Sequence, residues 1–292
     1  MKRGKRGQIA LYVIIAIVIV GVIAVLFAFR SQIFKPSFTA EEAQKLVSAQ
    51  VQPVRDTVEG CMRTMAMKTL NTMGRGGGYA YPKAERVSVP TSVMPDALAI
   101  SYALYKDSTG YQNYLPSLNE MKSEFVDFVG KNPDWSSCIN NFANFKLILD
   151  VSNGSLAMNS SALDFGEKSG QIVIIFTYPV TIAKQNATSL IDNYIVRIPV
   201  NLYLIHDTAA SITNNIASGG NFVVLLQDLA KQQEANLRIN PEAETILVRS
   251  SSYTEELSLS PPVYAARTLF KVQYNNKALE TPFDFYLLAG ED

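Results

Sequence analysis

The side chains that could perform chemistry in this sequence are few. His206 is the only histidine among the 292 residues, so a site that needs a base near neutral pH would have to use it. It lies in Leu-Ile-His-Asp, where we expect a strand to pass into a helix, and the chain has no Gly-x-Ser-x-Gly motif. We therefore interpret His206 as a capping or solvated side chain rather than as a member of a catalytic triad.

Paired carboxylates offer a second chemistry, because two acidic groups can act as acid and base in glycoside hydrolysis. The candidate pairs are Glu255 with Glu256 and Glu124 with Asp127. The first pair falls in a segment that we expect to be a loop, and the second on a helix face. Carboxylates are ordinary in both places, so neither pair by itself indicates a catalytic site.

A glycine-rich segment, Gly74-Arg-Gly-Gly-Gly-Tyr-Ala-Tyr-Pro82, invites comparison with phosphate-binding loops. Such a loop follows a strand and precedes a helix, whereas this segment follows an expected helix, so we interpret it as a helix end and chain reversal. The sequence has no metalloprotease, Cys-x-x-Cys, P-loop or EF-hand pattern. One histidine and two cysteines are too few ligands for a structural zinc site. We expect no catalytic residues, no cofactor and no metal.

The charge of the chain is concentrated at its start. Without Lys2, Arg3, Lys5 and Arg6, the 26 basic residues fall to 22, against 26 acidic ones. The remainder is mildly acidic and lacks the basic excess that neutralises phosphates. We therefore expect no nucleic-acid partner.

Residues 9–29 form a run of 21 uncharged residues, which spans about 31 Å as an α-helix and matches the hydrocarbon core of a bilayer. The apolar region of a cleaved secretory signal is shorter, about 7–15 residues. The run therefore favours a retained membrane helix over a discarded signal peptide. Because the basic cluster precedes it, the N-terminus is expected in the cytoplasm and the chain beyond about residue 31 outside the cell.

Two further features agree with an outer location. Asn153, Asn159 and Asn186 each begin an Asn-x-Ser/Thr sequon and are candidates for N-glycosylation. Cys61 and Cys138 would meet oxidising conditions and are expected to form a disulfide, with two buried free thiols as the alternative. Closing a loop of this length stabilises a fold by about 4–5 kcal/mol in the chain-entropy model.

Helical periodicity dominates the first half of the outer region. Thr39 and Glu42 form a capping-box pattern, and apolar residues then recur every three or four positions to about Met73. Pro53 lies in the middle and is expected to kink this helix or to begin a second one. Further helices are expected at 116–129, around Trp135, Cys138 and Phe142, at 205–217 and at 221–237.

Strand-like alternation begins after residue 144. Pro179 and Pro199 should open an edge or create a bulge, because proline cannot donate to the ladder. Short strands are also expected near 87–89 and 98–104. The alternating segments are 145–151, 172–182, 194–204, 267–274 and 282–289, and the stretch 183–193 is expected to be a loop.

Together these patterns predict an α+β fold: an N-terminal transmembrane or filament-core helix, a long amphipathic helix, and then a mostly antiparallel sheet with packed helices. Most aromatic side chains fall on inward positions. Five tyrosines fall in expected loops, where we would look for partner contact: Tyr79, Tyr81, Tyr105, Tyr111 and Tyr114. The expected organisation is a basic leader (1–7), an apolar helix (8–30), a linker (31–37) and an extracytoplasmic domain (38–292).

The junction Lys5-Arg6-Gly7-Gln8, directly followed by the apolar run, resembles the class III signal peptide of archaeal type IV pilins and archaellins. The resemblance implies that a prepilin peptidase cleaves between Gly7 and Gln8, and that the apolar helix then packs with its copies in a filament core. Bacterial-type pilins carry a glutamate at the fifth mature position, where this chain has Tyr12; archaeal members often lack it.

A second stretch, Val-Arg-Asp-Thr-Val-Glu-Gly-Cys-Met-Arg and onward to Pro82, is similar to single-span archaeal surface proteins of uncharacterised function. The sequence therefore leads to two hypotheses. The first is a non-enzymatic, homo-oligomeric subunit of a pilus-like extracellular filament, assembled through residues 9–29. The second is a single-span protein, anchored in the cell membrane and displayed on the surface, that serves adhesion or ligand binding.

Overall fold

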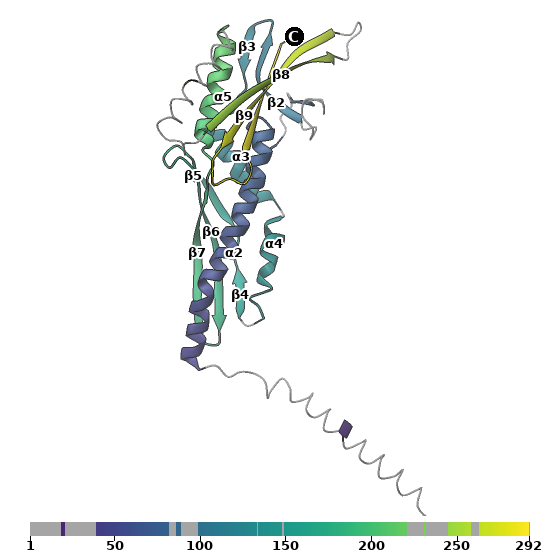
Figure 1. Ribbon diagram of the computed structural model, residues 1–292. Helices are drawn as coiled ribbons and strands as arrows, with labels where there is room; N and C mark the ends of the chain where they lie inside the picture. Colours follow the sequence, from purple (N-terminus) through teal and green to yellow (C-terminus); the bar gives the residue numbers. More distant parts are fainter. Residues whose placement is uncertain are drawn as a thin grey trace, which may run out of the picture.

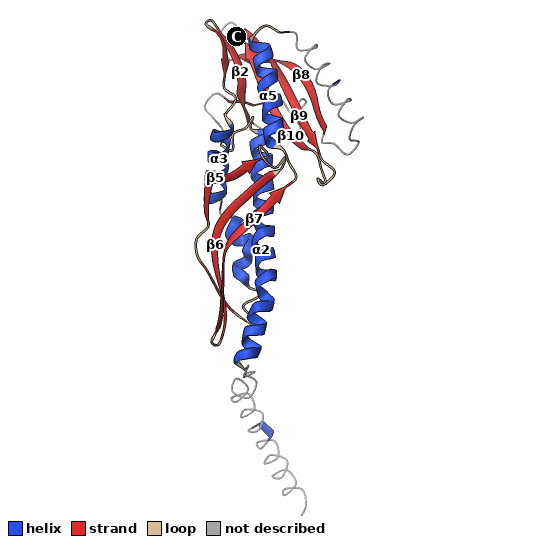
Figure 2. Cartoon of the chain, turned by 90° about the vertical axis from the view of Figure 1, so that its left-hand side faces the viewer, coloured by secondary structure: helices blue, strands red, loops and turns tan. Residues whose placement is uncertain are grey.

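The computed structural model describes residues 19–20, 39–81, 86–88, 99–132, 134–147, 149–220, 231, 245–257 and 263–291. In this part, helices combine with two sheets that are antiparallel except for one strand pair, which confirms the predicted α+β class. The long helix α2 passes along a four-stranded sheet at one end and reaches a six-stranded sheet at the other (Figures 1 and 2).

The leader (1–7), the linker (31–37) and most of the predicted apolar helix lie outside the described residues; of that helix only Ile19 and Val20 are described. Among the helices of the described part, none has both the length and the apolar character needed to cross a membrane. The membrane or filament-core helix therefore stays a prediction.

Helix α2 covers Ala40–Arg75 and begins as predicted. The backbone N–H of Thr39 donates to Glu42 Oε2 at 2.8 Å, and the N–H of Glu42 donates to Thr39 Oγ1 at 3.2 Å. The helix continues through Pro53, so the alternative of a second helix starting there is wrong. The lost backbone hydrogen bond is offset because Val47 and Val54 are fully buried on either side.

The glycine segment ends α2, as the sequence predicts. Gly77 and Gly78 have φ of 73° and 96°, and the N–H of Gly78 donates to the Met73 carbonyl at 2.8 Å. This hydrogen bond across the helix end reverses the chain. Gly74 lies where α2 meets the six-stranded sheet, and a Cβ there would collide with the Asp284 carbonyl. Glycine is needed at this crossing for close approach.

The four-stranded sheet consists of β4 (Asp150–Asn153), β5 (Ala157–Phe165), β6 (Ile172–Lys184) and β7 (Ala187–Ile198). Strand β7 pairs along one edge of β6, and β4 and β5 share the other edge at opposite ends. The predicted inward side chains of β6 are all buried beneath α2 and its neighbours. The register shifts between Thr177 and Val180, which is the bulge expected at Pro179.

Three strand expectations here need correction. Residues 183–193 are not a loop. Strands β6 and β7 form a hairpin with Gln185 and Asn186 in its turn, and β7 continues as a strand because residues along it are buried on one face. Strand β7 ends at Ile198 rather than at 204, since Pro199 cannot extend the ladder and the Asn201 side chain caps α5. Residues 143–147 form turns rather than a strand.

The six-stranded sheet has the order β1-β2-β10-β9-β8, with β3 also paired to β2, and only β10–β2 is parallel. It contains the strands expected near 87–89, 98–104, 267–274 and 282–289. Its strands are β1 (Arg86–Ser88), β2 (Ala99–Asp107), β3 (Gly110–Asn113), β8 (Thr245–Leu257), β9 (Val263–Asn275) and β10 (Phe283–Glu291).

The remaining helices are α3 (Leu118–Lys131), α4 (Asp134–Ile139), the 3₁₀ turn η1 (Asn140–Phe142) and α5 (Leu202–Ala217). Helices α3 and α4 pack on α2, and α5 lies against the six-stranded sheet (Figure 2). They correspond to the predicted helices at 116–129, around Trp135 and at 205–217. The predicted helix at 221–237 lies outside the described residues, Lys231 excepted.

Candidate functional site: the α4 cavity and the outer face of the four-stranded sheet

Among the described residues, the side chains that could take part in catalysis do not lie together in one site. His206 is half-buried inside α5, where its Nε2 lies 2.8 Å from the Pro116 carbonyl oxygen. The imidazole therefore ties α5 to the segment before α3, so the prediction of a capping or solvated histidine at a strand–helix junction is wrong. The sequence missed this contact because its partner lies 90 positions away.

The candidate acid pairs are also separated by their structural roles. Glu124 Oε2 accepts from the N–H groups of Ala80 and Tyr81, at 2.9 and 3.4 Å, and so holds the chain after α2. Asp127 pairs with Lys131 at 2.7 Å. Glu255 and Glu256 lie in β8 and not in a loop. Within the described ranges no three metal-ligating side chains cluster.

The predicted disulfide joins Cys61 of α2 to Cys138 of α4, and neither cysteine is free. An ion pair between Lys68 and Asp134 links the same two helices. Trp135, the next residue after Asp134, packs edge-on against Phe176 of β6, with ring centroids 6.1 Å apart. Helix α4, only six residues long, is thus fixed to both α2 and the sheet.

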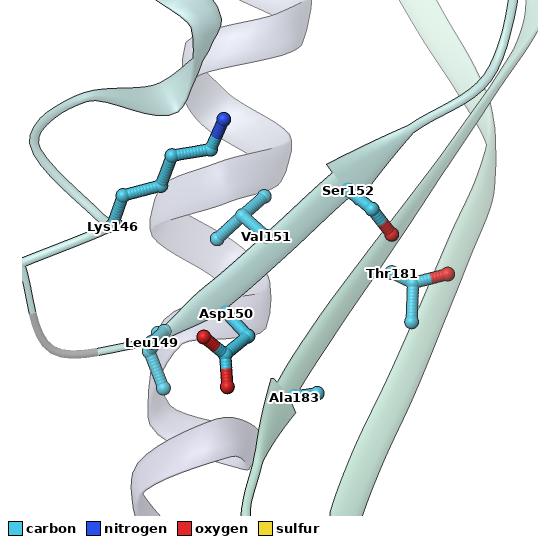
Figure 3. A pocket seen from close by; sticks show the side chains of 7 residues that line it. All are labelled: Lys146, Leu149, Asp150, Val151, Ser152, Thr181 and Ala183. Atoms are coloured by element: carbon cyan, nitrogen blue, oxygen red, sulfur yellow. The ribbon is translucent and has the colours of Figure 1, made fainter.

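Two cavities flank the short strand β4. The Lys146 cavity, about 380 Å³, is lined by Lys146, Leu149 to Ser152, Thr181 and Ala183. Figure 3 shows that the Lys146 amine and the Asp150 carboxylate point in different directions. This divergence gives no arrangement for acid–base chemistry.

The second cavity, which we name the α4 cavity, also measures about 380 Å³. Its walls are Trp135 and Ile139 of α4, Asn153 at the end of β4, residues 154–156 between β4 and β5, and Tyr178 of β6. The rings of Trp135 and Tyr178 meet edge-on, with centroids 5.2 Å apart. Burial raises the pKa of the Tyr178 phenol, against smaller lowering effects of the Asn153 and Trp135 side chains.

All three candidate glycosylation sites lie on the surface of the four-stranded sheet. Asn153 is the last residue of β4 and lines the α4 cavity. Asn159 lies in β5, where its Oδ1 accepts from the N–H of Ser161 at 3.0 Å. Asn186 stands in the exposed turn between β6 and β7. Their side chains are exposed, as the sequence suggests, and their occupancy stays a prediction.

The outer face of the four-stranded sheet exposes an aliphatic pair that sequence reasoning missed. Ile175 and Ile195 lie directly opposite each other on β6 and β7 and are 44% and 43% exposed; Leu190, on β7, is 62% exposed. Among the described strands β7 pairs with β6 alone, so its other edge has no partner strand there. The available signal was that Ile175 lies between inward residues of β6, on the opposite face.

The tyrosines expected in loops are mostly packed. The Tyr79 hydroxyl donates to the Tyr114 carbonyl at 2.8 Å, and the Tyr81 ring contacts Phe128 at a centroid distance of 5.3 Å. Tyr105 and Tyr111 lie in β2 and β3 rather than in loops. Tyr81 and Tyr114 remain more than one-third exposed. Partner contact through these residues stays a prediction.

Comparison with known proteins adds no relative from which a function could be transferred. The chain matches no protein-family model, and no curated protein or solved structure is detectably similar to it.

Proposed function

We propose that this protein is a non-enzymatic subunit of an archaeal type IV pilus-like extracellular filament. The observation that carries the proposal is the uncharged run 9–29 behind the Lys5-Arg6-Gly7-Gln8 junction, placed before an elongated body that includes a disulfide. A helix that is apolar on all sides can bury its surface equally well in lipid or against identical helices. Such a helix can hold the protein in the cell membrane before assembly and form the filament core afterwards.

The described surface of residues 38–292 suits an aqueous environment outside the membrane. The exposed side of α2 carries charged residues such as Glu41, Lys45 and Arg63, and Glu41 pairs with Lys45 at 2.8 Å. A charged helix side of this kind is costly inside a bilayer. The Cys61–Cys138 disulfide suits an oxidising compartment. Both features support an N-terminus inside the cell and residues 38–292 outside it.

Contacts between filament bodies would form on the outer face of the four-stranded sheet. The pair Ile175 and Ile195 makes a small aliphatic surface beside the edge of β7 that has no partner among the described strands. Burying such a surface against a copy stabilises association by about 25 cal/mol per Å² of apolar area. The filament proposal thus gives a role to Ile175 and Ile195, which are partly exposed and do not belong to the buried core.

A second candidate is a static, membrane-anchored surface protein for adhesion or ligand binding. The α4 cavity and the exposed rings of Tyr81 and Tyr114 favour it, because partner-binding residues concentrate on loops and concave sites. Both candidates need the apolar helix. They differ in whether the leader is removed and whether copies assemble.

The N-terminal mass of the protein purified from membranes and from sheared surface filaments separates the two. A chain that begins at Gln8 and is recovered in filaments supports the subunit, and an intact Met1 supports the static anchor. Gly7→Val should block cleavage by the prepilin peptidase, since a branched side chain replaces the small residue at the cut. Gly4→Val is the matched control in the same leader and should leave cleavage unchanged.

A further inference from the structure

The α4 cavity is built partly from a glycosylation sequon. Asn153, Gly154 and Ser155 line it together with Trp135 of α4 and Tyr178 of β6, and the Asn153 side chain hydrogen-bonds the Tyr178 phenol. The three parts come from separate segments between Trp135 and Tyr178 and meet only in the folded protein. An exposed acceptor for a sugar therefore lines a cavity that also has two aromatic side chains in its lining.

The chemistry of these walls suits a sugar ring. Trp135, Tyr178, Ile139 and Leu156 give the cavity an apolar lining against which the C–H groups of a pyranose can pack, and Trp135 and Tyr178 contribute the 9% and 4% of their surfaces that remain exposed. The volume of about 380 Å³ lies within the range of about 300–1,000 Å³ that is usual for ligand sites.

One polar group in the cavity wall lacks its counterpart. Trp135 is only 9% exposed, and within the described residues its indole N–H makes no hydrogen bond of regular geometry, although it lies close enough to the Tyr178 phenol to lower the pKa of that group. An unsatisfied buried donor costs about 1–3 kcal/mol. An acetamido or hydroxyl oxygen of a sugar in the cavity would accept this hydrogen bond.

The other two sequons differ from Asn153 in their surroundings. The Asn153 Nδ2 donates to the Gly154 carbonyl at 3.4 Å and its side chain hydrogen-bonds Tyr178 in the cavity wall, whereas the Asn159 amide oxygen accepts from Ser161 and Asn186 stands at the outer tip of the β6–β7 hairpin. Neither residue lines either of the cavities beside β4. Asn153 alone of the three combines an exposed acceptor with a concave aromatic surface.

We propose that an N-linked glycan on Asn153 folds back and places its first sugar ring in the α4 cavity, against Trp135 and Tyr178. The inference rests on the extracytoplasmic placement in the proposed function. In the covalent step, Nδ2 of Asn153 bonds to the anomeric carbon of a lipid-phosphate-linked glycan. The lipid phosphate leaves with the electrons of the broken carbon–oxygen bond, and the amide releases one proton.

The test uses the full-length protein purified from its own membranes. Glycopeptide mass spectrometry should find Asn153 occupied. Trp135 is the only tryptophan in the chain, so its fluorescence reports on this cavity alone. Ser155→Ala removes the sequon but keeps Asn153, and it should shift the emission to longer wavelength and increase quenching by acrylamide. Ser155→Thr keeps the sequon and should match the parent protein.

Two controls isolate the glycan. Asn186→Gln removes a sequon far along the hairpin and should leave Trp135 emission unchanged. Ser155→Ala should also have no effect in protein made in a host without N-glycosylation, because no sugar is then lost. Emission that is the same for Ser155→Ala and Ser155→Thr in native protein, with Asn153 occupied, overturns the docking.

The outcomes also separate this inference from the proposed function. A bare Asn153 with sugar on Asn159 or Asn186 refutes the inference and leaves the outer placement intact. If all three are bare and Cys61 and Cys138 are free thiols, the inference fails together with the placement on which it rests.

Discussion

The Cys61–Cys138 disulfide allows the most quantitative prediction. The two cysteines are 77 positions apart, and the chain between them runs from α2 through β1, β2, β3 and α3 to α4. For a loop of this length the chain-entropy relation gives about 15 cal/mol/K, or about 4.5 kcal/mol at 25 °C. We expect Cys61→Ala/Cys138→Ser to lose this amount of unfolding free energy.

The assay is guanidinium unfolding of the full-length protein in detergent, followed by the fluorescence of Trp135 on the stapled helix α4. The m-value should rise in the variant, because an uncrosslinked unfolded chain exposes more surface. The melting temperature should fall by about 9–18 °C, since 1 kcal/mol shifts a domain of this size by about 2–4 °C. Parent protein reduced with a thiol is the matched control and should show the same losses.

One result would refute this reasoning. If the variant and the reduced parent both lose less than about 1 kcal/mol with an unchanged m-value, the crosslink does not restrict the unfolded chain in the way the entropy relation assumes. The ion pair of Lys68 with Asp134 is exposed and cannot by itself replace the disulfide, because exposed pairs contribute only about 0–1 kcal/mol.

Three further predictions follow from burial and hydrogen bonding. Phe125→Ala creates a cavity at a fully buried position of α3 and should lower the unfolding free energy by about 3–5 kcal/mol in thermal or chemical unfolding. Phe128→Ala, at a half-buried position of the same helix, should lower it less. Equal losses for the two variants would contradict the difference in burial. Burial raises the pKa of Asp164, but hydrogen bonds to its carboxylate outweigh this effect and hold the pKa below its ordinary value. The stability that this carboxylate contributes should therefore be lost as the pH falls through the lowered pKa. Asp164→Asn should make the unfolding free energy depend less on pH below about pH 4. Ile175→Ser/Ile195→Ser should reduce the filament yield seen by electron microscopy, while the unfolding free energy changes by about 1 kcal/mol or less, because each of two surface substitutions contributes about 0.5 kcal/mol at most. An unchanged yield would show that this surface takes no part in assembly.

The sequence by itself determined the features that depend on near neighbours. The start of α2 follows from Thr39 and Glu42, because a capping box needs only residues three positions apart. The inward face of β6 follows from strict alternation, and the bulge from Pro179. The disulfide could be predicted because the chain contains only two cysteines, so only one pairing is possible. The class of fold followed from these local periods.

Tertiary structure alone decided the elements whose stability comes from distant partners. The serine-rich segment from Ser251 that contains Glu255 and Glu256 is expected from its sequence to be a loop, yet residues 251–257 belong to β8. This strand pairs with β9 along its whole length, and the pairing with a distant strand stabilises it. Ile175 faces Ile195 because the turn at Gln185 and the bulge set the register. The α4 cavity joins three separate chain segments, and no local pattern encodes their meeting, because only the packing of α2, α4 and the sheet brings them together.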